Sequence, residues 1–223
     1  MHERPVVPPL DDVLACVRED RRAGRLEGWS WSTVIDENVG EAVVDRELFE
    51  RIHEAADVTA RFPVGNAGLI HVYGYLFSTV RTPYGFKSDR WNDGALARSL
   101  DFPDGWFRLG DSDDETPLER VLEAALPLLV DPPADMLVRD WPISETTAQR
   151  AVVTSTEDGP GALVSGIDDG SGWKLLTIFP VSDTATFAGT LDDATRPRWN
   201  AAPPRVPDSR ASAHPAALPE PRK

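Results

Sequence analysis

The chain has 223 residues, of which 41% are hydrophobic and 27% are charged, a composition typical of a globular protein with a full-sized core. Its 37 acidic residues outnumber its 23 basic residues, and the resulting net charge of −14 repels phosphate backbones and anionic lipid surfaces. Neither a nucleic-acid partner nor a membrane partner is therefore expected. The single cysteine, Cys16, excludes an internal disulfide bond and a cysteine-based zinc cluster.

The chain begins with a segment that lacks a core pattern, followed by a helix. Residues 1–9 contain several prolines and are expected to be extended. Asp11 or Asp12 can cap a helix that runs to about Ala23, and Gly24 is a typical stop signal after it. No apolar leader stands at the N-terminus, and no run approaches the roughly 18 apolar residues of a membrane span, so a cytoplasmic location is expected.

A strand and a second helix follow. Leu26–Asp36 alternates between apolar and polar side chains, which predicts a strand. Asp45 is a typical N-cap for the second helix, and Val44 and Phe49 stand at the two positions of a hydrophobic staple. The apolar spacing carries this helix toward Pro63.

The next segment, Leu69–Arg81, is predicted to be a long strand. Its side chains divide with a period of two into an aliphatic face and a face that carries rings and polar groups. Thr82–Gly85 has proline at its second position and glycine at its fourth, which is typical of a type I turn. A short helix is expected over Trp91–Leu100.

The second half of the chain begins with a helix and closes with strands. Thr116 and Glu119 have the spacing of a capping box, Pro117 suits the first helical position, and the helix should end before Pro132. Short strands separated by Gly- and Asp-rich turns follow, which is typical of an antiparallel meander. The predicted strands are Arg150–Thr156, Ala162–Ile167 and Trp173–Val181.

These elements predict an α+β fold, in which the helices of the N-terminal half pack on a mainly antiparallel sheet that is closed by the C-terminal meander. Residues 10–195 are expected to form a single domain. Residues 196–223 are rich in proline and alanine and lack a core pattern. We therefore expect a tail that is disordered or draped on the surface.

The functional hypothesis rests on the ring-bearing face of Leu69–Arg81. His71, Tyr73 and Tyr75 alternate with aliphatic residues and offer one titratable imidazole and two hydroxyls. In a pocket, these three would be the catalytic residues, with His71 transferring protons while the tyrosines orient a substrate or stabilise an oxyanion. The structural alternative is that the rings pack beneath a helix and their hydroxyls bond to the backbone.

The residues at the end of this segment and just after it add candidate binding groups. They combine cations, a carboxylate and a ring within a few positions, and Arg90 could hold a carboxylate. The predicted substrate-binding residues are Arg81, Tyr84, Lys87, Asp89 and Arg90. An ordinary solvated loop, in which Asp89 offsets its basic neighbours, is the alternative.

No motif points to a metal or a cofactor. His53 and His71 lack the spacing of zinc ligands, and the acidic run Gly110–Glu115 lacks the glycine and the glutamate that a calcium loop requires. The chain contains no nucleophile elbow, no phosphate loop and no dinucleotide fingerprint. Neither a metal nor an organic cofactor is therefore expected.

Two functions remain open from the sequence. The first is an enzyme that performs acid–base or hydrolytic chemistry on a small polar or aromatic molecule in a pocket lined by His, Tyr and Arg. The second is a non-catalytic module that binds a ligand or a protein partner through an acidic surface rich in tryptophan, of which the chain has seven. Loss of turnover with an intact fold on replacing His71 would favour the enzyme, whereas a large loss of stability would indicate a structural histidine.

Overall fold

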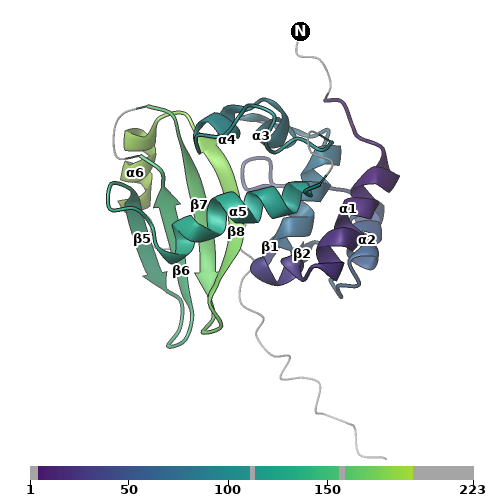
Figure 1. Ribbon diagram of the computed structural model, residues 1–223, viewed down its shortest axis with the longest axis horizontal. Coiled ribbons are helices and arrows are strands. Elements are labelled where there is room, and N and C mark those ends of the chain that lie inside the picture. The colour runs from purple at the N-terminus through teal and green to yellow at the C-terminus, as the bar shows by residue number, and fades with distance from the viewer. Residues whose placement is uncertain (1–4, 111–113, 156–158, 193–223) are drawn as a thin grey trace, which may run out of the picture.

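The C-terminal half forms a four-stranded antiparallel sheet in the order β5–β6–β7–β8, a meander with one strand more than the sequence indicates (Figure 1). The computed structural model describes residues 5–110, 114–155 and 159–192. The strands of the sheet are β5 (Leu137–Pro142), β6 (Ala148–Val153), β7 (Gly161–Asp168) and β8 (Trp173–Val181). With the helices that surround the sheet, this gives the α+β architecture that the sequence predicts.

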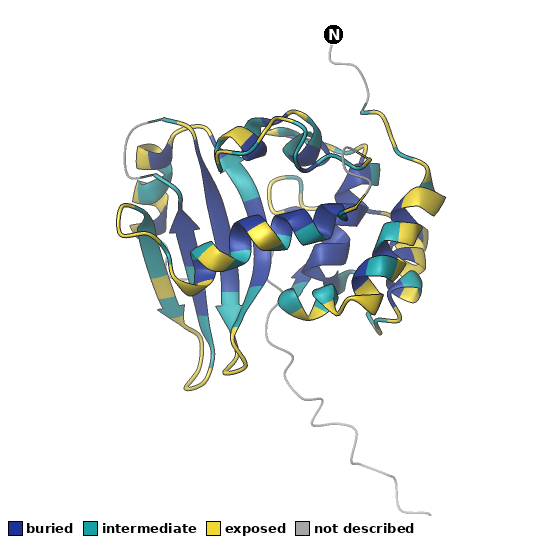
Figure 2. Cartoon of the chain, in the orientation of Figure 1, coloured by how far each residue is buried: buried dark blue, intermediate teal, exposed yellow. Residues whose placement is uncertain are grey.

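Both faces of the sheet are covered, so that its inner strands are buried almost throughout (Figure 2). Helix α5 (Pro117–Val130) packs on one face, and α6 (Thr184–Asp192) packs on the other. Side chains alternate between these two environments, as strand geometry requires. Val152 belongs to the core that α5 shares, whereas the neighbouring Ala151 and Val153 form a separate cluster with α6.

Close packing of α5 on the sheet depends on a glycine. A Cβ atom at Gly166 would lie 2.5 Å from a methyl carbon of Leu129, which is too close for any side chain. The register of β7 against β8 shifts between Ser165 and Gly166, at the same place. Absence of a side chain at Gly166 therefore lets α5 approach β7 at a β-bulge.

The N-terminal half is mainly helical. Its α-helices are α1 (Leu10–Arg22), α2 (Arg46–Ala55), α3 (Asp89–Asn92) and α4 (Ala95–Arg98). Tighter or wider helical turns occur at η1 (Arg25–Gly28, 3-10), η2 (Leu69–Tyr73, π) and η3 (Gly74–Phe77, 3-10). Two antiparallel ribbons pair β1 (Trp31–Thr33) with β2 (Val64–Asn66) and β3 (Arg81–Thr82) with β4 (Gly85–Phe86).

Backbone hydrogen bonds join this half to the edge of the sheet. Ser30 N donates to Leu175 O on β8 at 3.0 Å, and Trp29 forms an isolated parallel bridge with Leu175. Ala67 N in turn donates to Ser30 O at 2.7 Å. The segment before β1 therefore covers part of the β8 edge, which would otherwise present unpaired groups.

Several local signals in the sequence are confirmed. Asp45 caps α2 by accepting a hydrogen bond from Leu48 N at 2.8 Å, and Thr116 caps α5 by accepting from Glu119 N at 3.1 Å. Helix α1 begins at Leu10, with Pro9 rather than an aspartate at the N-cap. The acidic residues proposed as its caps lie instead in its first turn, where negative charge is also favourable.

The predicted strand Leu69–Arg81 is wrong for most of its length, because residues 69–77 are helical. Every residue from Leu69 to Leu76 is buried, so the segment runs through the interior and has no solvent face. A buried backbone must pair its N–H and C=O groups, and helical turns pair them within the segment itself. Of the predicted strand, only Arg81 lies in one, at the short β3–β4 ribbon whose turn spans the Thr82–Gly85 segment.

Other predicted elements differ in extent. Within Leu26–Asp36 the regular strand is only β1, because the start of the segment belongs to η1. Helix α2 ends at Ala55, and Asp57 takes a positive φ of 52°, which interrupts the helix before Pro63. The helix expected over Trp91–Leu100 is divided into α3 and α4 by Gly94, with φ of 76°.

Two elements, β5 and α6, were not predicted. Three sequence-based expectations fall wholly or partly outside the described residues: the beginning of the 1–9 segment, the centre of the acidic run, and the 196–223 tail. Within the described ranges, no helix has the length and apolar character needed to cross a bilayer.

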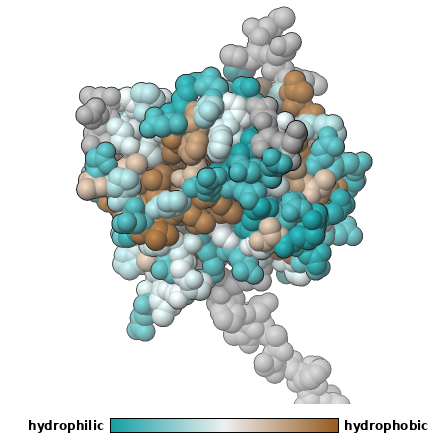
Figure 3. All heavy atoms as spheres, viewed as in Figure 1, coloured by the Kyte–Doolittle hydropathy of each residue, from teal (hydrophilic) through white to brown (hydrophobic). Residues whose placement is uncertain are grey.

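The surface above α5 is not uniformly polar. Figure 3 shows hydrophobic residues gathered over the C-terminal half of α5 and the adjoining sheet. Val130 at the end of the helix is 62% exposed, and Leu122 and Leu126 are half-buried. By contrast, none of the six described tryptophans is exposed, so these six do not form the tryptophan-rich surface that one of the sequence hypotheses invokes.

Candidate functional site

His71 lies on η2 in the middle of the molecule and is 1% exposed. Its Nδ1 atom is 2.7 Å from Leu176 O on β8, and its Nε2 atom is 2.9 Å from Ser32 Oγ on β1. A carbonyl oxygen can only accept, so Nδ1 carries the proton and donates to Leu176. Nε2 is then the acceptor for the Ser32 hydroxyl, which defines a neutral imidazole of one tautomer.

The surroundings of His71 hold it in this neutral form. Burial lowers the pKa of His71 well below 6.5, and the positive charges of Arg90 and Lys87 lower it further, although the hydrogen bond with Leu176 opposes them. The Tyr75 ring lies beside the imidazole, with 5.0 Å between ring centroids. His71 therefore stays uncharged at neutral pH.

Two cations from the β3–β4 ribbon and α3 converge on the Tyr75 ring. Lys87 Nζ lies 5.3 Å from the ring centroid, and the Arg90 guanidinium carbon lies 5.4 Å from it. Lys87 also forms an ion pair with Asp36, whose side chain is 2% exposed. Burial opposes ionisation of Asp36, but the hydrogen bond and charge of Lys87 outweigh it and hold the pKa of Asp36 below its usual range.

The structure thus brings together four of the eight predicted site residues: His71, Tyr75, Lys87 and Arg90. Three residues that the sequence did not indicate complete the cluster: Ser32, Asp36 and Thr177. Ser32 is 39 positions before His71, and no motif joins them, so only the tertiary fold reveals the pair.

The other four predicted residues lie elsewhere. Arg81 is exposed, and Tyr84, at the turn of the β3–β4 ribbon, is 83% exposed. Asp89 accepts a hydrogen bond from Phe86 N at 2.8 Å and so stabilises the end of that ribbon. The Tyr73 hydroxyl donates to the buried carboxylate of Asp20 on α1.

Asp20 is the centre of a second buried polar cluster. Its carboxylate accepts hydrogen bonds from the hydroxyls of Tyr73 and Thr116, and Arg25 forms an ion pair with it. Burial raises the pKa of Asp20, although these three partners favour its ionised form. Arg25 also pairs with Glu119, so this cluster links α1, η1, η2 and the start of α5.

The Ser32–His71 pair has the hydrogen-bond pattern of a serine nucleophile and its base. The base accepts from the hydroxyl, and a third group, the Leu176 carbonyl, fixes its tautomer. Ser32 is fully buried, however, and neither residue lines the cavity found in the described part of the chain. In this conformation no substrate reaches the pair, and its direct effect is to tie β1, η2 and β8 together.

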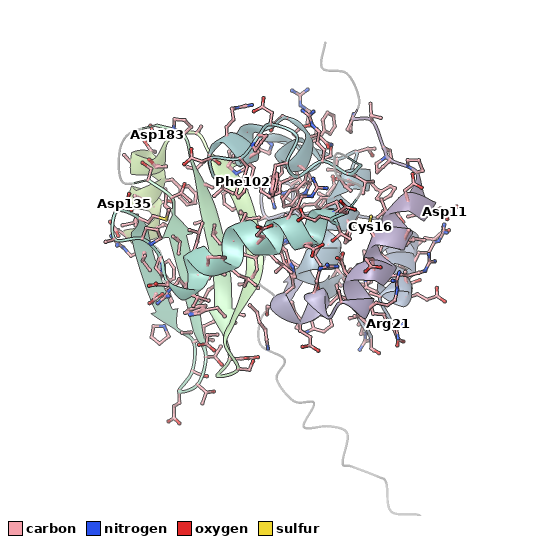
Figure 4. The ribbon with its side chains drawn as sticks, viewed as in Figure 1. Asp11, Cys16, Arg21, Phe102, Asp135 and Asp183 are labelled. Atoms are coloured by element: carbon pink, nitrogen blue, oxygen red, sulfur yellow. The ribbon has the colours of Figure 1, made fainter. Side chains whose placement is uncertain are left out.

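A cavity of about 680 Å³ lies on another side of η3, and we call it the α1–α3 pocket. Its walls come from the N-terminal segment before α1, from α1, from the start of α3 and from the loop that leads to α5. Cys16 is on this wall, on the side of α1 that faces the beginning of α5 (Figure 4). Of the predicted site residues, only Asp89 lines it.

Two polar side chains in the α1–α3 pocket have unused hydrogen-bonding groups. Ser88 is fully buried, and its hydroxyl has no partner within the described structure. Arg108 donates from Nε to Asn92 O at 2.9 Å, and no carboxylate of the described chain pairs with it. The pocket wall therefore offers a hydroxyl and a guanidinium to a bound molecule.

The Cys16 thiol is not an activated nucleophile. Burial raises its pKa, and the nearby carboxylates of Asp20 and Asp12 raise it further. Since the thiolate is the reactive species, the pocket is better suited to binding than to thiol chemistry.

Neither a metal cluster nor a known relative assigns a chemistry to these sites. Across residues 5–110, 114–155 and 159–192, no group of three or more His, Cys, Asp or Glu side chains is arranged to hold a metal ion. No family model, curated protein or solved structure matches the chain. The side chains themselves therefore provide the basis for inferring a function.

Stability should fall as the solution is acidified from about pH 6.5 to about pH 5.5. His71 and His53 both have pKa values lowered chiefly by burial, so below 6.5 the unfolded chain takes up protons that the folded chain does not. Each such histidine lowers the free energy of unfolding by up to about 1.4 kcal/mol per pH unit. Urea denaturation across this interval should show a combined loss of about 2 kcal/mol.

A His53→Gln variant provides the control for this pH effect. His53 donates from Nδ1 to Phe49 O and accepts at Nε2 from Asn66 N, so it is buried neutral like His71. Its removal should reduce the pH slope by up to half. Asp20, with its raised pKa, acts in the opposite direction at lower pH, so the interval near pH 6 is the informative one. A stability that does not change across it would contradict the neutral assignment of both histidines.

Proposed function

We propose that this protein binds a small polar molecule in the α1–α3 pocket without transforming it. The observation that carries the proposal is the fully buried Ser88 hydroxyl, which has no partner in the described structure. A buried hydroxyl without a hydrogen bond costs about 1 to 3 kcal/mol, and a ligand oxygen or nitrogen would remove this cost. The volume of about 680 Å³ is in the range of pockets that hold metabolite-sized molecules.

The charges on the pocket wall indicate the class of ligand. Three carboxylates, of Asp12, Asp89 and Glu115, line the pocket together with one guanidinium, of Arg108. One of the three, Asp89, already accepts a hydrogen bond from the backbone. A molecule that carries both an amino group and a carboxylate, such as a free amino acid, would pair with both kinds of wall group. An amine without an acid group would leave Arg108 unpaired.

Ser88→Ala and Arg108→Gln should both weaken binding, with opposite consequences in the empty protein. Loss of a charge-assisted hydrogen bond at Arg108 should weaken affinity about 10-fold to 100-fold. Ser88→Ala should weaken affinity as well, but should raise the free energy of unfolding of the ligand-free protein by about 1 kcal/mol, because it removes an unsatisfied hydroxyl. The measurement is calorimetric titration with the common amino acids, after a thermal-shift comparison with diamines and neutral sugars.

Arg98→Gln is the matched control, since Arg98 is an exposed arginine paired with Asp104 and lies outside the pocket. It should leave affinity unchanged. Binding that survives both Ser88→Ala and Arg108→Gln would place the ligand elsewhere. Absence of binding across all three ligand classes would reject the proposal.

A second candidate, hydrolysis at Ser32 with His71 as the base, is supported by one observation. Ser32 Oγ and His71 Nε2 are 2.9 Å apart, within the distance at which a base activates a serine. Both groups are buried, so this function needs β1 to move away from η2 before a substrate can enter. Replacement of His71 separates the two candidates, because only the hydrolase loses its function with that side chain.

A further inference from the structure

Arg90 is a half-buried arginine without an acidic partner. Its guanidinium lies between three aromatic rings, with centroid distances of 5.4 Å to Tyr75, 5.4 Å to Phe179 and 5.8 Å to Trp91. Within the described ranges, no carboxylate is at ion-pair distance from it. Such a charge is costly to bury unless a partner compensates it.

The hydrogen bonds of Arg90 are mostly unused. A guanidinium has five N–H donors, and the described protein engages one nitrogen, Nη1, through Thr177 Oγ1 at 3.3 Å. The remaining nitrogens are not among the buried atoms that lack a partner, so they reach solvent. Because rings pack against the guanidinium, its plane is fixed and its free edge is preorganised.

The local charge around Arg90 is positive, although the protein as a whole carries −14. Lys87 and Arg90 contribute two positive charges, Asp36 contributes one negative charge, and His71 is neutral, which leaves one positive charge uncompensated. Burial lowers the pKa of both Arg90 and Lys87, which is consistent with charges that lack full compensation. A single negative charge would complete the cluster.

We propose that Arg90 binds the carboxylate group of a small organic acid at this surface. The fixed guanidinium edge can offer two parallel N–H groups, the geometry that suits a planar carboxylate. One uncompensated positive charge matches a monoanion better than a phosphate dianion. This site is separate from the α1–α3 pocket, because neither Arg90 nor Lys87 lines that pocket.

The test follows the side-chain Nε–H resonance of Arg90 during titration of the full-length protein with sodium acetate and sodium benzoate. Sodium chloride at equal ionic strength is the reference. We expect the Arg90 resonance to shift and saturate with both carboxylates and not with chloride. The same titrations should raise the melting temperature by a few degrees, and Arg90→Gln should abolish that rise.

Arg150 is the internal control, because it is stacked on an aromatic ring in the same way but already has its carboxylate. Its guanidinium lies 4.5 Å from the Trp173 ring centroid, and two of its nitrogens contact Asp140 at 2.8 Å. Its Nε–H resonance should not move. If the Arg150 and Arg90 resonances shift equally, or if Arg90 does not respond, the proposal is wrong.

Two further arms separate the alternatives. A response that disappears in Arg108→Gln would assign the carboxylate to the α1–α3 pocket and overturn the Arg90 site. Inorganic phosphate that binds at least about tenfold more tightly than acetate would overturn the monocarboxylate class. The resonance titration uses the wild-type protein, so it remains decisive even where Arg90→Gln fails to fold.

Discussion

His71→Ala should lower the free energy of unfolding by about 3 to 4 kcal/mol and the melting temperature by about 10 °C. The substitution removes the acceptor of the Ser32 hydroxyl and the donor to the Leu176 carbonyl, both in the interior. It also leaves a cavity where the imidazole faces Tyr75. Urea and thermal denaturation at neutral pH measure the loss.

A double-mutant cycle with Ser32→Ala tests whether the two side chains act as a unit. The double variant should lose less stability than the sum of the two single variants, because one deletion removes the group that the other would leave unpaired. The opposite result is equally informative. An ester-hydrolysing activity that vanishes in His71→Ala, with an unchanged melting temperature, would make His71 catalytic and support the hydrolase candidate.

Asp20→Ala should have an effect of similar or larger size, about 3 to 5 kcal/mol. Two buried hydroxyls, of Tyr73 and Thr116, lose their acceptor, and Arg25 loses one of its two acidic partners. Thr116 also caps α5, so its altered orientation weakens the start of that helix. Thermal denaturation of the purified variant should show a fall of about 10 °C or more in the melting temperature.

Two variants provide the controls for Asp20. Asp20→Asn keeps an oxygen acceptor of nearly the same shape and should recover part of the loss. Glu50→Ala removes an exposed acid that pairs with Arg46 one helical turn away, and should change stability by less than about 0.5 kcal/mol. If Asp20→Ala costs no more than Glu50→Ala, the buried cluster does not stabilise the fold.

The parts of the fold that the sequence predicted correctly are those set by neighbours in the chain. Asp45 and Thr116 cap helices through bonds to residues three positions later, and the closing strands are separated by Gly- and Asp-rich turns. Such contacts can be inferred from spacing alone. β5 was missed because its outer side chains are half-buried or exposed, so its apolar signal is weak.

The error at Leu69–Arg81 has a physical cause. The alternation of rings with aliphatic residues suggested two faces with different environments, but residues 69–76 meet the interior on all sides. When every position is buried, the period of the sequence no longer reports the geometry of the backbone. The pairing of segments far apart in the chain then decides the conformation.

The candidate site was accessible to sequence reasoning only in part. Lys87 and Arg90 lie close together in the chain and follow the ring-bearing segment, so their proximity to Tyr75 could be anticipated. The contacts that Asp36 and Thr177 make come from β1 and β8, and no local pattern indicates them. The same holds for the α1–α3 pocket, whose wall combines residues from Pro5 to Pro117.

The helical segment at residues 69–76 also determines how the protein unfolds. Its polar groups are bonded to four different parts of the chain: Asp20 on α1, Ser32 on β1, Trp91 on α3 and Leu176 on β8. None of these partners can separate without exposing it to water. The sheet and the N-terminal helices should therefore unfold in one cooperative transition, and neither half should be stable as an isolated fragment.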